Sequence, residues 1–340
     1  FALGLCLPKT AWPPTLNINI WLTKRCNLQC TYCYEGIAKE TESMSKIICD
    51  KVIAYVQEIN EPVNIRFHGG EPLLEYDKLQ YLYEKLKTNE NVKTFGITTN
   101  ALLLDENKIN FLAQSMNDFS ISIDGTKEIH DKHRKDTNGK GTYDKVCKLI
   151  PQILKMDPHA RARMTITADA VPHLYESVKS IVELGFKVIA MAVDVFDPNW
   201  NDEIKAQYLT QVNKIKCEYC KNSSLHIGVI EQENIKRLAP CGGGKNSIHI
   251  STDGKFYPCS YAVGVKDFII GNLEEGINEG KIKEIEYIAQ SANSVCEGCT
   301  VYDFCPGTRC KIINKVVSGN YDIPPIATCI DMNVKINVLY

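Results

Sequence analysis

Apolar and polar residues alternate along this chain in short runs that are separated by longer stretches with helical spacing. The short runs are rich in β-branched and aromatic residues, as in "NINIWLT", which favour extended backbone. In the longer stretches apolar residues recur every three or four positions, as with Met44, Ile48 and Val52. The pattern predicts strands at 17–23, 63–68, 94–99, 119–124, 162–167 and 187–193, with helices at 44–60, 75–87, 105–115, 142–156, 172–184 and 202–220.

Such repeated alternation of strand and helix predicts an α/β fold with a parallel sheet and right-handed crossovers. Six units fit a partial barrel as well as an open doubly wound sheet, and periodicity alone does not decide between them. After residue 225 helical periodicity fades, glycine and cysteine become denser, and "SIHISTDGKFYPC" predicts a hairpin that turns at Asp253 and Gly254. We therefore expect a main domain over 17–225 and a small cysteine-rich domain over 226–340 that needs metal to hold it.

The N-terminal segment 1–16 begins "FALGLCLPKT", which is apolar but short and lacks both a basic flank and an initiator Met. We expect a processed or trimmed end there, not a signal peptide. The 340 residues are 44% hydrophobic and 24% charged, with a net charge of −2, as in an ordinary globular protein. Without a strong basic field or a run of about 18 apolar residues, we expect neither nucleic acid nor a membrane as partner.

Fifteen cysteines are many for a chain of this length, and they cluster. In a small secreted protein this would indicate disulfides, but the chain is large and carries no secretion signal. Metal ligation in a reducing cytoplasm is the better interpretation, so we expect a cytoplasmic protein.

The first cluster is "RCNLQCTYCYE", which places Cys26, Cys30 and Cys33 directly after the first predicted strand. Loops that follow strands of a parallel sheet carry active sites. Three thiolates can hold three irons of a [4Fe–4S] cluster and leave the fourth iron free to bind a small molecule through nitrogen and oxygen. The alternative is a zinc site completed by a remote ligand such as Cys49 or a histidine.

The segment "HGGEP" (68–72) follows the second predicted strand. Gly69 and Gly70 let the backbone approach a ligand closely, Glu71 offers a carboxylate acceptor, and Pro72 stiffens the exit. Alone, "GGEP" is an ordinary turn. Next to the three-cysteine loop, it is expected to form a second wall of one pocket.

The CxxxCxxC loop followed by GGEP resembles the radical S-adenosylmethionine (radical SAM) enzymes. This resemblance implies a partial (β/α)6 barrel in which the open iron is chelated by the amino and carboxylate groups of S-adenosylmethionine. A reduced cluster then splits this cofactor into methionine and a 5′-deoxyadenosyl radical, which takes a hydrogen atom from an unactivated C–H bond. Cluster and cofactor carry the chemistry, so no catalytic side chain is assigned.

The resemblance also implies contacts to S-adenosylmethionine. Backbone groups around Gly69 and Gly70, with Glu71, would bind the methionine amino group, and Tyr32 would neighbour the adenine. In "SISIDG" the polar residues at 122 and 124 share one face of a strand. Arg134 would pair with the methionine carboxylate unless it is a solvated surface charge, and Thr99 and Asn100 are weaker candidates for the pocket mouth. The predicted binding residues are Tyr32, Gly69, Gly70, Glu71, Asn100, Ser122, Asp124 and Arg134.

A second cysteine series fills the C-terminal part of the chain. It resembles the SPASM extension of radical SAM enzymes, which carries two auxiliary [4Fe–4S] clusters, although zinc ribbons use similar spacings. The resemblance assigns Cys241, Cys259 and Cys310 to the first auxiliary cluster, and Cys296, Cys299, Cys305 and Cys329 to the second.

Two departures from the SPASM pattern matter. "CPGTRC" spaces Cys305 and Cys310 by four residues where three are common, and no cysteine lies between Cys241 and Cys259. Seven ligands make one full cluster and one with an open iron. That iron stays open unless it is closed by Cys6, or by Cys217 or Cys220, which form a CxxC. Cys49 and Cys147 are expected to be buried apolar thiols.

An open auxiliary iron could bind a substrate thiolate, and a carbon radical joined to that sulfur gives a thioether. The resemblance therefore implies a maturase of ribosomally made peptides that contain cysteine, served by a flavodoxin- or ferredoxin-type reductant. A leader-binding module is not found in the sequence. The nearest alternative is the sulfatase-maturase branch, in which an Asp follows the cysteine matching Cys259; here the residue is Ser260. Carbon–carbon crosslinking or epimerisation, and a non-catalytic iron–sulfur or zinc protein, remain further alternatives.

Overall fold

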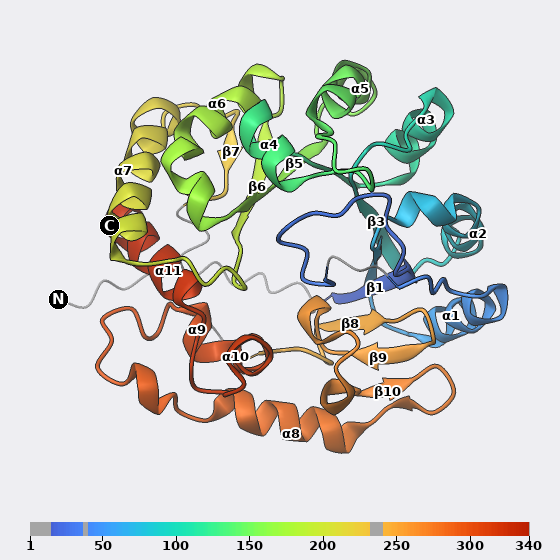
Figure 1. The fold of residues 1–340 in the computed structure, drawn as a ribbon. Coiled ribbons are helices and arrows are strands. Elements are labelled where there is room, and N and C mark those ends of the chain that lie inside the picture. Colours follow the sequence, from blue (N-terminus) through green and yellow to red (C-terminus); the bar gives the residue numbers. More distant parts are fainter. Residues whose placement is uncertain (1–14, 37–39, 232–240, 340) are drawn as a thin grey trace.

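Six parallel strands, hydrogen-bonded in chain order, form the centre of the protein (Figure 1). The structure is a computed structural model that describes residues 15–36, 40–231 and 241–339. The strands are β1 (Leu16–Thr23), β2 (Val63–Gly69), β3 (Val92–Thr99), β4 (Asp118–Ser122), β5 (Arg161–Ile166) and β6 (Val188–Val193). Each predicted strand is present within two residues of its expected ends, and the strand order is that of a partial barrel.

The predicted helices are present between the strands and surround them (Figure 1). They are α1 (Lys46–Glu58), α2 (Tyr76–Leu86), α3 (Glu106–Ser115), α5 (Tyr143–Met156), α6 (Leu174–Glu183) and α7 (Asp202–Tyr219). The sequence sets where they begin: the side chain of Ser45 accepts from the Ile48 N–H at the start of α1, and that of Asp105 accepts from the Lys108 N–H at the start of α3. Their buried faces close the core against the outer face of the strands.

Several short elements were not predicted. They include α4 (Lys127–His133) and the 3-10 turns η1 (Pro72–Glu75), η2 (Ala168–His173), η4 (Ser260–Ala262), η5 (Lys266–Phe268) and η6 (Ser294–Cys296). The α4 helix matters most for the site because it ends at Arg134, which lies at its C-cap.

The C-terminal part continues the barrel sheet. Strand β8 (Ser247–Ile250) pairs in parallel with β1, in a register that matches Asn17 with Ser247 and Ile20 with Ile250. Strand β9 (Lys255–Tyr257) pairs antiparallel with β8 across a turn in which Gly254 has a φ of 83°, so the predicted hairpin is confirmed. With β7 (His226–Ile227), β10 (Gly271–Asn272) and β11 (Gly276–Ile277), the sheet has eleven strands in the order β11-β10-β9-β8-β1-β2-β3-β4-β5-β6-β7.

The expectation that helical structure fades after residue 225 is wrong. The structure has α8 (Glu279–Gln290), α9 (Pro306–Arg309), α10 (Lys311–Ser318) and α11 (Ile326–Leu339). Helix α11 packs against α7, and its buried residues include Ala327, Met332 and Val338. Its apolar residues lie all round the helix, so they leave no stripe of helical period to detect. Among the described residues, no helix combines the length and the hydrophobicity that crossing a membrane requires.

Candidate active site

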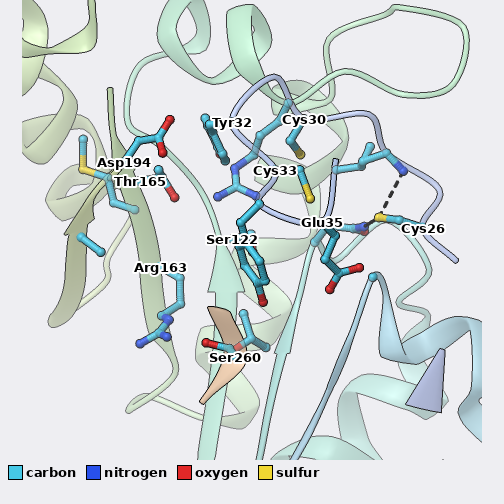
Figure 2. A pocket seen from close by; sticks show the side chains of 18 of the residues that line it. Cys26, Cys30, Tyr32, Cys33, Glu35, Ser122, Arg163, Thr165, Asp194 and Ser260 are labelled. Atoms are coloured by element: carbon cyan, nitrogen blue, oxygen red, sulfur yellow. Dashed lines mark hydrogen bonds between the residues drawn. The ribbon is translucent and has the colours of Figure 1, made fainter. Parts of the chain in front are cut away.

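A cavity of about 350 Å³ opens at the carboxyl ends of the barrel strands (Figure 2). Ten of the residues discussed below line it: Cys26, Cys30, Tyr32, Cys33, Gly69, Gly70, Glu71, Asn100, Ser122 and Arg134. These are the whole predicted N-terminal site except Asp124, which is fully buried beside it. The structure therefore brings together residues that are spread over more than a hundred positions of sequence.

The cysteine loop is held in place by contacts with the segment that follows α4. Backbone N–H groups of Gln29 and Thr31 donate to the carbonyl groups of Lys135 and His133 at 2.8 and 3.0 Å. The Thr31 hydroxyl also lies 2.7 Å from Nδ1 of His133. Because Cys30 lies between these two anchored residues, its position is set by the loop backbone.

At the other end of the loop, the sulfur of Cys26 accepts from the Leu28 N–H at 3.4 Å and lies 3.9 Å from Nδ2 of Asn100 (Figure 2). The same Asn100 nitrogen donates to Oδ1 of Asn27 at 2.8 Å. Asn100 thus connects the end of β3 to the cysteine loop. The sequence predicted Asn100 as a binding residue at the pocket mouth, but not this contact with the cysteine loop.

Glu71 braces the second wall of the cavity from inside the protein. Its carboxylate is 1% exposed and accepts hydrogen bonds from the N–H groups of Leu73 and Asn100, at 3.1 and 2.8 Å, and from the Thr99 hydroxyl at 2.7 Å. Burial raises the pKa of Glu71 to about 7, against the effect of these three donors. The structure thus uses this carboxylate to fix Asn100, and its predicted contact with a methionine amino group remains a prediction.

The two glycines of the "HGGEP" turn are needed because the cysteine loop crosses them. The N–H groups of Gly70 and Glu71 donate to the carbonyl groups of Thr23 and Arg25, both at 2.9 Å. A Cβ on Gly69 would lie 2.2 Å from the Thr23 oxygen, and one on Gly70 would lie 2.3 Å from the Arg25 oxygen. The glycines therefore allow close approach of the protein's own backbone.

We expect Gly69→Ala to lower the free energy of unfolding by about 1–3 kcal/mol more than Gly139→Ala does, in urea unfolding followed by circular dichroism. Both glycines have positive φ, 131° and 74°, so both variants carry backbone strain. Only at Gly69 would the new methyl group also collide with backbone, since no atom lies within 4 Å of a Cβ at Gly139. Equal losses in the two variants would show that the contact with Thr23 is not tight.

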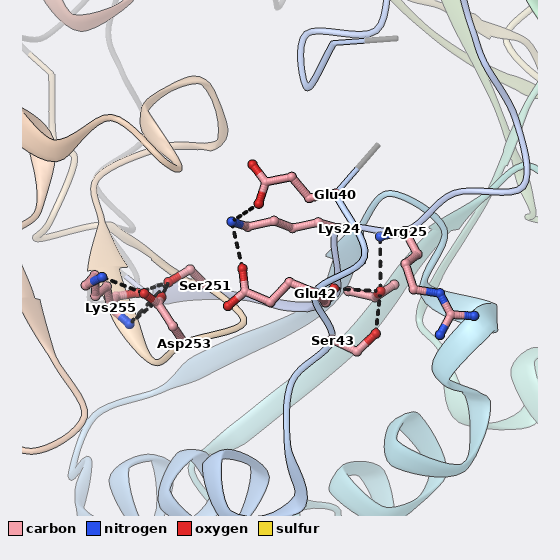
Figure 3. A network of polar contacts seen from close by, with 9 residues as sticks. Lys24, Arg25, Glu40, Glu42, Ser43, Ser251, Asp253 and Lys255 are labelled. Atoms are coloured by element: carbon pink, nitrogen blue, oxygen red, sulfur yellow. Dashed lines mark hydrogen bonds and ion pairs between the residues drawn. The ribbon is translucent and has the colours of Figure 1, made fainter. Parts of the chain in front are cut away.

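The segment after the cysteine loop returns to β1 through polar contacts (Figure 3). The Thr23 hydroxyl lies 2.8 Å from that of Ser43, and Lys24 forms ion pairs with Glu40 and Glu42 at 2.7 and 2.8 Å. These charges are partly exposed, so each pair contributes at most about 1 kcal/mol. Their effect is to fix where the loop leaves and rejoins the strand.

Asp124, Arg134 and Tyr32 form a buried group under the cavity. Arg134 donates to both carboxylate oxygens of Asp124, at 2.8 Å from Nε and 3.0 Å from Nη2, and the Tyr32 hydroxyl donates to the same carboxylate. The Thr165 N–H donates to Oδ1 of Asp124 at 3.0 Å. Burial opposes the ionised carboxylate, but Arg134 outweighs it and holds the pKa of Asp124 below its usual value.

This geometry places the predicted cofactor contacts at different depths. Ser122 lines the cavity, whereas Asp124 is fully buried and positions Tyr32 and Arg134. Arg134 is only 8% exposed, so it is not a solvated surface charge. Arg134 lines the cavity, and its contact with a carboxylate of a ligand remains a prediction.

The cavity also has a wall that the sequence analysis did not single out as a site. Arg163, Thr165, Asp194 and Tyr261 line it, together with Ser260 (Figure 2). Burial raises the pKa of Asp194, and the charge of Asp194 adds to the raised pKa of Tyr261. The sequence could have indicated these residues through their positions relative to the predicted strands. Arg163 and Thr165 lie on β5 and Asp194 directly follows β6, and active sites of parallel sheets gather at the carboxyl ends of the strands.

The charges of the seven C-terminal cysteines act on one another within two groups, and the assignment of these groups to two clusters, which the resemblance implies, remains a prediction. Burial raises the pKa of Cys259 to about 12, and the charges of Cys310 and Cys241 add to the rise. Burial likewise raises the pKa of Cys329 to about 11, with contributions from Cys305, Cys296 and Cys299. Thiols act on one another's pKa in this way only at short range. The two groups are therefore Cys241, Cys259 and Cys310, and Cys296, Cys299, Cys305 and Cys329.

The donor chemistry of these groups fits iron–sulfur clusters. In the described part of the chain, no three His, Cys, Asp or Glu side chains converge as ligands of a single metal ion. In a [4Fe–4S] cluster each thiolate binds a different iron, so its ligands stand further apart than those of one ion. Because cysteine binds iron as a thiolate, binding of a cluster has to release protons from thiols that are protonated beforehand.

The other cysteines have varied surroundings. Cys49 is buried, as expected of an apolar thiol, and burial raises its pKa to about 11, whereas Cys147 is only partly buried. Cys217 and Cys220 are exposed at the C-terminal end of α7, unlike the partly buried members of the Cys241 group. Cys6 lies outside the described residues.

Comparison with known proteins finds a family match in the part of the chain that includes the cysteine loop. Residues 20–157 match the family described as the radical SAM superfamily. The cysteine-type anaerobic sulfatase-maturating enzyme of Clostridium perfringens is 25% identical over 323 residues, which cover 84% of this chain and 86% of that enzyme. The antilisterial bacteriocin subtilosin biosynthesis protein AlbA of Bacillus subtilis is 24% identical over 327 residues, covering 89% of this chain and 69% of AlbA.

Two solved structures share the fold. The native enzyme anSMEcpe with bound AdoMet and Kp18Cys peptide superposes with a TM-score of 0.79 at 22% identity, covering 96% of this chain and 97% of that one. SuiB of Streptococcus suis bound to its precursor peptide SuiA gives a TM-score of 0.66 at 18% identity, covering 93% and 76%.

Proposed function

We propose that this chain, whose residues 20–157 match the radical SAM superfamily, is a peptide maturase that forms a thioether crosslink at a cysteine of its substrate. Cys26, Cys30 and Cys33 would hold a [4Fe–4S] cluster at the cavity. With S-adenosylmethionine bound, this cluster supplies the 5′-deoxyadenosyl radical that abstracts hydrogen from the peptide. The residues that we propose to hold S-adenosylmethionine are Tyr32, Gly69, Gly70, Glu71, Asn100, Ser122, Asp124 and Arg134.

The observation that carries this proposal is the division of the C-terminal cysteines. Among the described residues the Cys241 group has three members and the Cys296 group has four, so the first of two auxiliary clusters would have one iron without a cysteine unless Cys6, Cys217 or Cys220 closes it. Such an open iron could bind a thiolate of the substrate, because thiolates are the usual ligands of these clusters. AlbA is named for the biosynthesis of a bacteriocin, and SuiB was solved with a precursor peptide, which favours a ribosomally made peptide as substrate.

The protein's own residues contribute position and shelter. The contacts of Asp124 with Arg134 and Tyr32 keep these side chains ready before a ligand arrives, and such preorganisation lowers the entropic cost of binding. The cavity wall opposite the cysteine loop, with Arg163, Asp194 and Tyr261, offers charged and hydroxyl groups to a peptide side chain. Electrons would come from a flavodoxin- or ferredoxin-type protein.

Formylglycine formation, the activity of the sulfatase-maturase branch, is the second candidate. The similarity to the Clostridium perfringens enzyme along most of both chains favours it. Against it, Ser260 stands where the resemblance implies an acidic residue that acts as a base. Asp194 lines the same cavity as Ser260, so a carboxylate is present in that space.

The test is anaerobic turnover of a short cysteine-containing peptide encoded beside this gene, with S-adenosylmethionine and dithionite, followed by mass spectrometry. We expect 5′-deoxyadenosine and a peptide that is lighter by two hydrogen atoms. One fewer of its thiols should react with iodoacetamide. A peptide with its cysteines changed to serine is the control and should stay unmodified. A product that instead reacts with hydrazides contains an aldehyde and would establish the second candidate.

A further inference from the structure

The C-terminal part buries a lysine close to both cysteine groups. Lys311 is 1% exposed although it begins helix α10. Its ammonium forms an ion pair with Asp322 and donates to the carbonyl group of Ala292 at 3.3 Å. An ammonium has three hydrogens to donate, and the described residues supply these two acceptors.

Lys311 touches one cysteine group through the chain and through a shared pocket. It directly follows Cys310, and it lines a small apolar pocket together with Cys241, Ile312 and Tyr321. Toward the other group, its ammonium donates to the carbonyl group of Ala292, which precedes Cys296 by four residues. Lys311 is therefore close to residues of both groups, and it begins helix α10, which lies beside α9 (Figure 1).

The burial of this charge needs a compensating partner. Removing an ammonium from water costs several kcal/mol. The side chain of Asp322 is 32% exposed, so its attraction to the ammonium offsets only part of this cost. Clusters ligated by thiolates are negatively charged and gain a further negative charge on reduction. In a site of low polarity a nearby positive charge interacts strongly with that additional charge.

Resting on the two auxiliary clusters of the proposed function, we propose that Lys311 is an electrostatic tuning residue that raises the reduction potential of the cluster held by Cys296, Cys299, Cys305 and Cys329. Its charge stabilises the reduced form of that cluster more than the oxidised form. Asp322 partly offsets this effect, and its carboxylate also holds the ammonium in place. A higher potential would suit a cluster that takes up an electron from the substrate side.

The experiment is a redox titration, followed by electron paramagnetic resonance, of the full-length protein in a Cys26→Ala/Cys30→Ala/Cys33→Ala background, where the auxiliary clusters alone contribute. We expect Lys311→Met to lower the ratio of reduced to oxidised cluster at least tenfold at a fixed potential, a shift of about 59 mV for a one-electron couple. Lys311→Arg keeps the charge and should change the ratio less than threefold. Lys315→Met, on the same helix, should leave it unchanged.

A second variant keeps the proposal testable if Lys311→Met loses iron. Asp322→Asn removes the opposing charge and should shift the same cluster in the other direction, toward easier reduction. Bound clusters with unshifted potentials in both variants would overturn the role of Lys311. Absence of any cluster signal from the unaltered C-terminal cysteines would instead overturn the auxiliary clusters, and with them the proposed function.

Discussion

Replacing Cys26, Cys30 and Cys33 together by alanine should reduce the formation of 5′-deoxyadenosine to background, while the protein retains about two thirds of its iron. These three sulfurs line the cavity, and the seven C-terminal cysteines form their own groups. Loss of one cluster of three should therefore abolish cleavage of S-adenosylmethionine without emptying the other two. Iron analysis and chromatography of the cleavage products measure both quantities on one sample.

The matched control is Cys49→Ala, which removes a buried thiol outside all three groups. It should leave both the iron content and the cleavage of S-adenosylmethionine close to those of the unaltered protein. Cleavage that survives in the triple variant would contradict the assignment of the N-terminal loop. Loss of all iron in the triple variant would show that the clusters do not assemble independently.

Arg134→Met should lower the free energy of unfolding by about 3–5 kcal/mol, because it leaves the carboxylate of Asp124 buried without its partner. Asp124 is fully buried and Arg134 nearly so. The double variant Arg134→Met/Asp124→Asn removes the uncompensated charge and should recover part of the loss. Urea unfolding followed by circular dichroism gives the three values.

The contribution of Asp124 to stability should change with pH in opposite directions in the unaltered protein and in Arg134→Met. The pKa of Asp124 is lower in the folded protein than in the unfolded chain, so the ion pair stabilises the fold above the unfolded pKa, and this contribution is lost as the pH falls through the folded value. Without Arg134, burial raises that pKa, so Arg134→Met should be less unstable at pH 5 than at pH 8. Lys127→Met, which breaks an exposed ion pair with Asp144 at the start of α4, should behave like the unaltered protein at both pH values. If Arg134→Met and Lys127→Met lost the same free energy of unfolding, the buried pair of Arg134 with Asp124 would stabilise the fold no more than the exposed pair does.

The local pattern was sufficient to predict the barrel because each strand and helix is specified by neighbours in sequence. Ser45 and Asp105 show this directly, since each caps the helix that begins beside it. The pairing of β1 with β8 lies beyond such reasoning. It joins Asn17 to Ser247, and a parallel register between segments so far apart leaves no mark on the periodicity of either.

The site was predicted in its residue types but not in its internal contacts. Cysteine spacing identified the thiols because ligand geometry constrains spacing. By contrast, the carboxylates of Glu71 and Asp124 bond to Asn100 and Arg134 inside the protein, and only three-dimensional proximity reveals such partners. The glycines at 69 and 70 were interpreted as room for a ligand, which stays a prediction, and the structure adds that they let the carbonyl groups of Thr23 and Arg25 approach closely.

The place of β1 in the sheet has a practical consequence for dissecting the protein. Strand β1 is hydrogen-bonded on one side to β2 and on the other to β8. A fragment that stops before β8 would expose a row of unsatisfied amide and carbonyl groups along an apolar strand, which is a template for self-association. Expressing the barrel alone should therefore yield aggregates, and the function of either part is best probed by point substitution within the intact polypeptide.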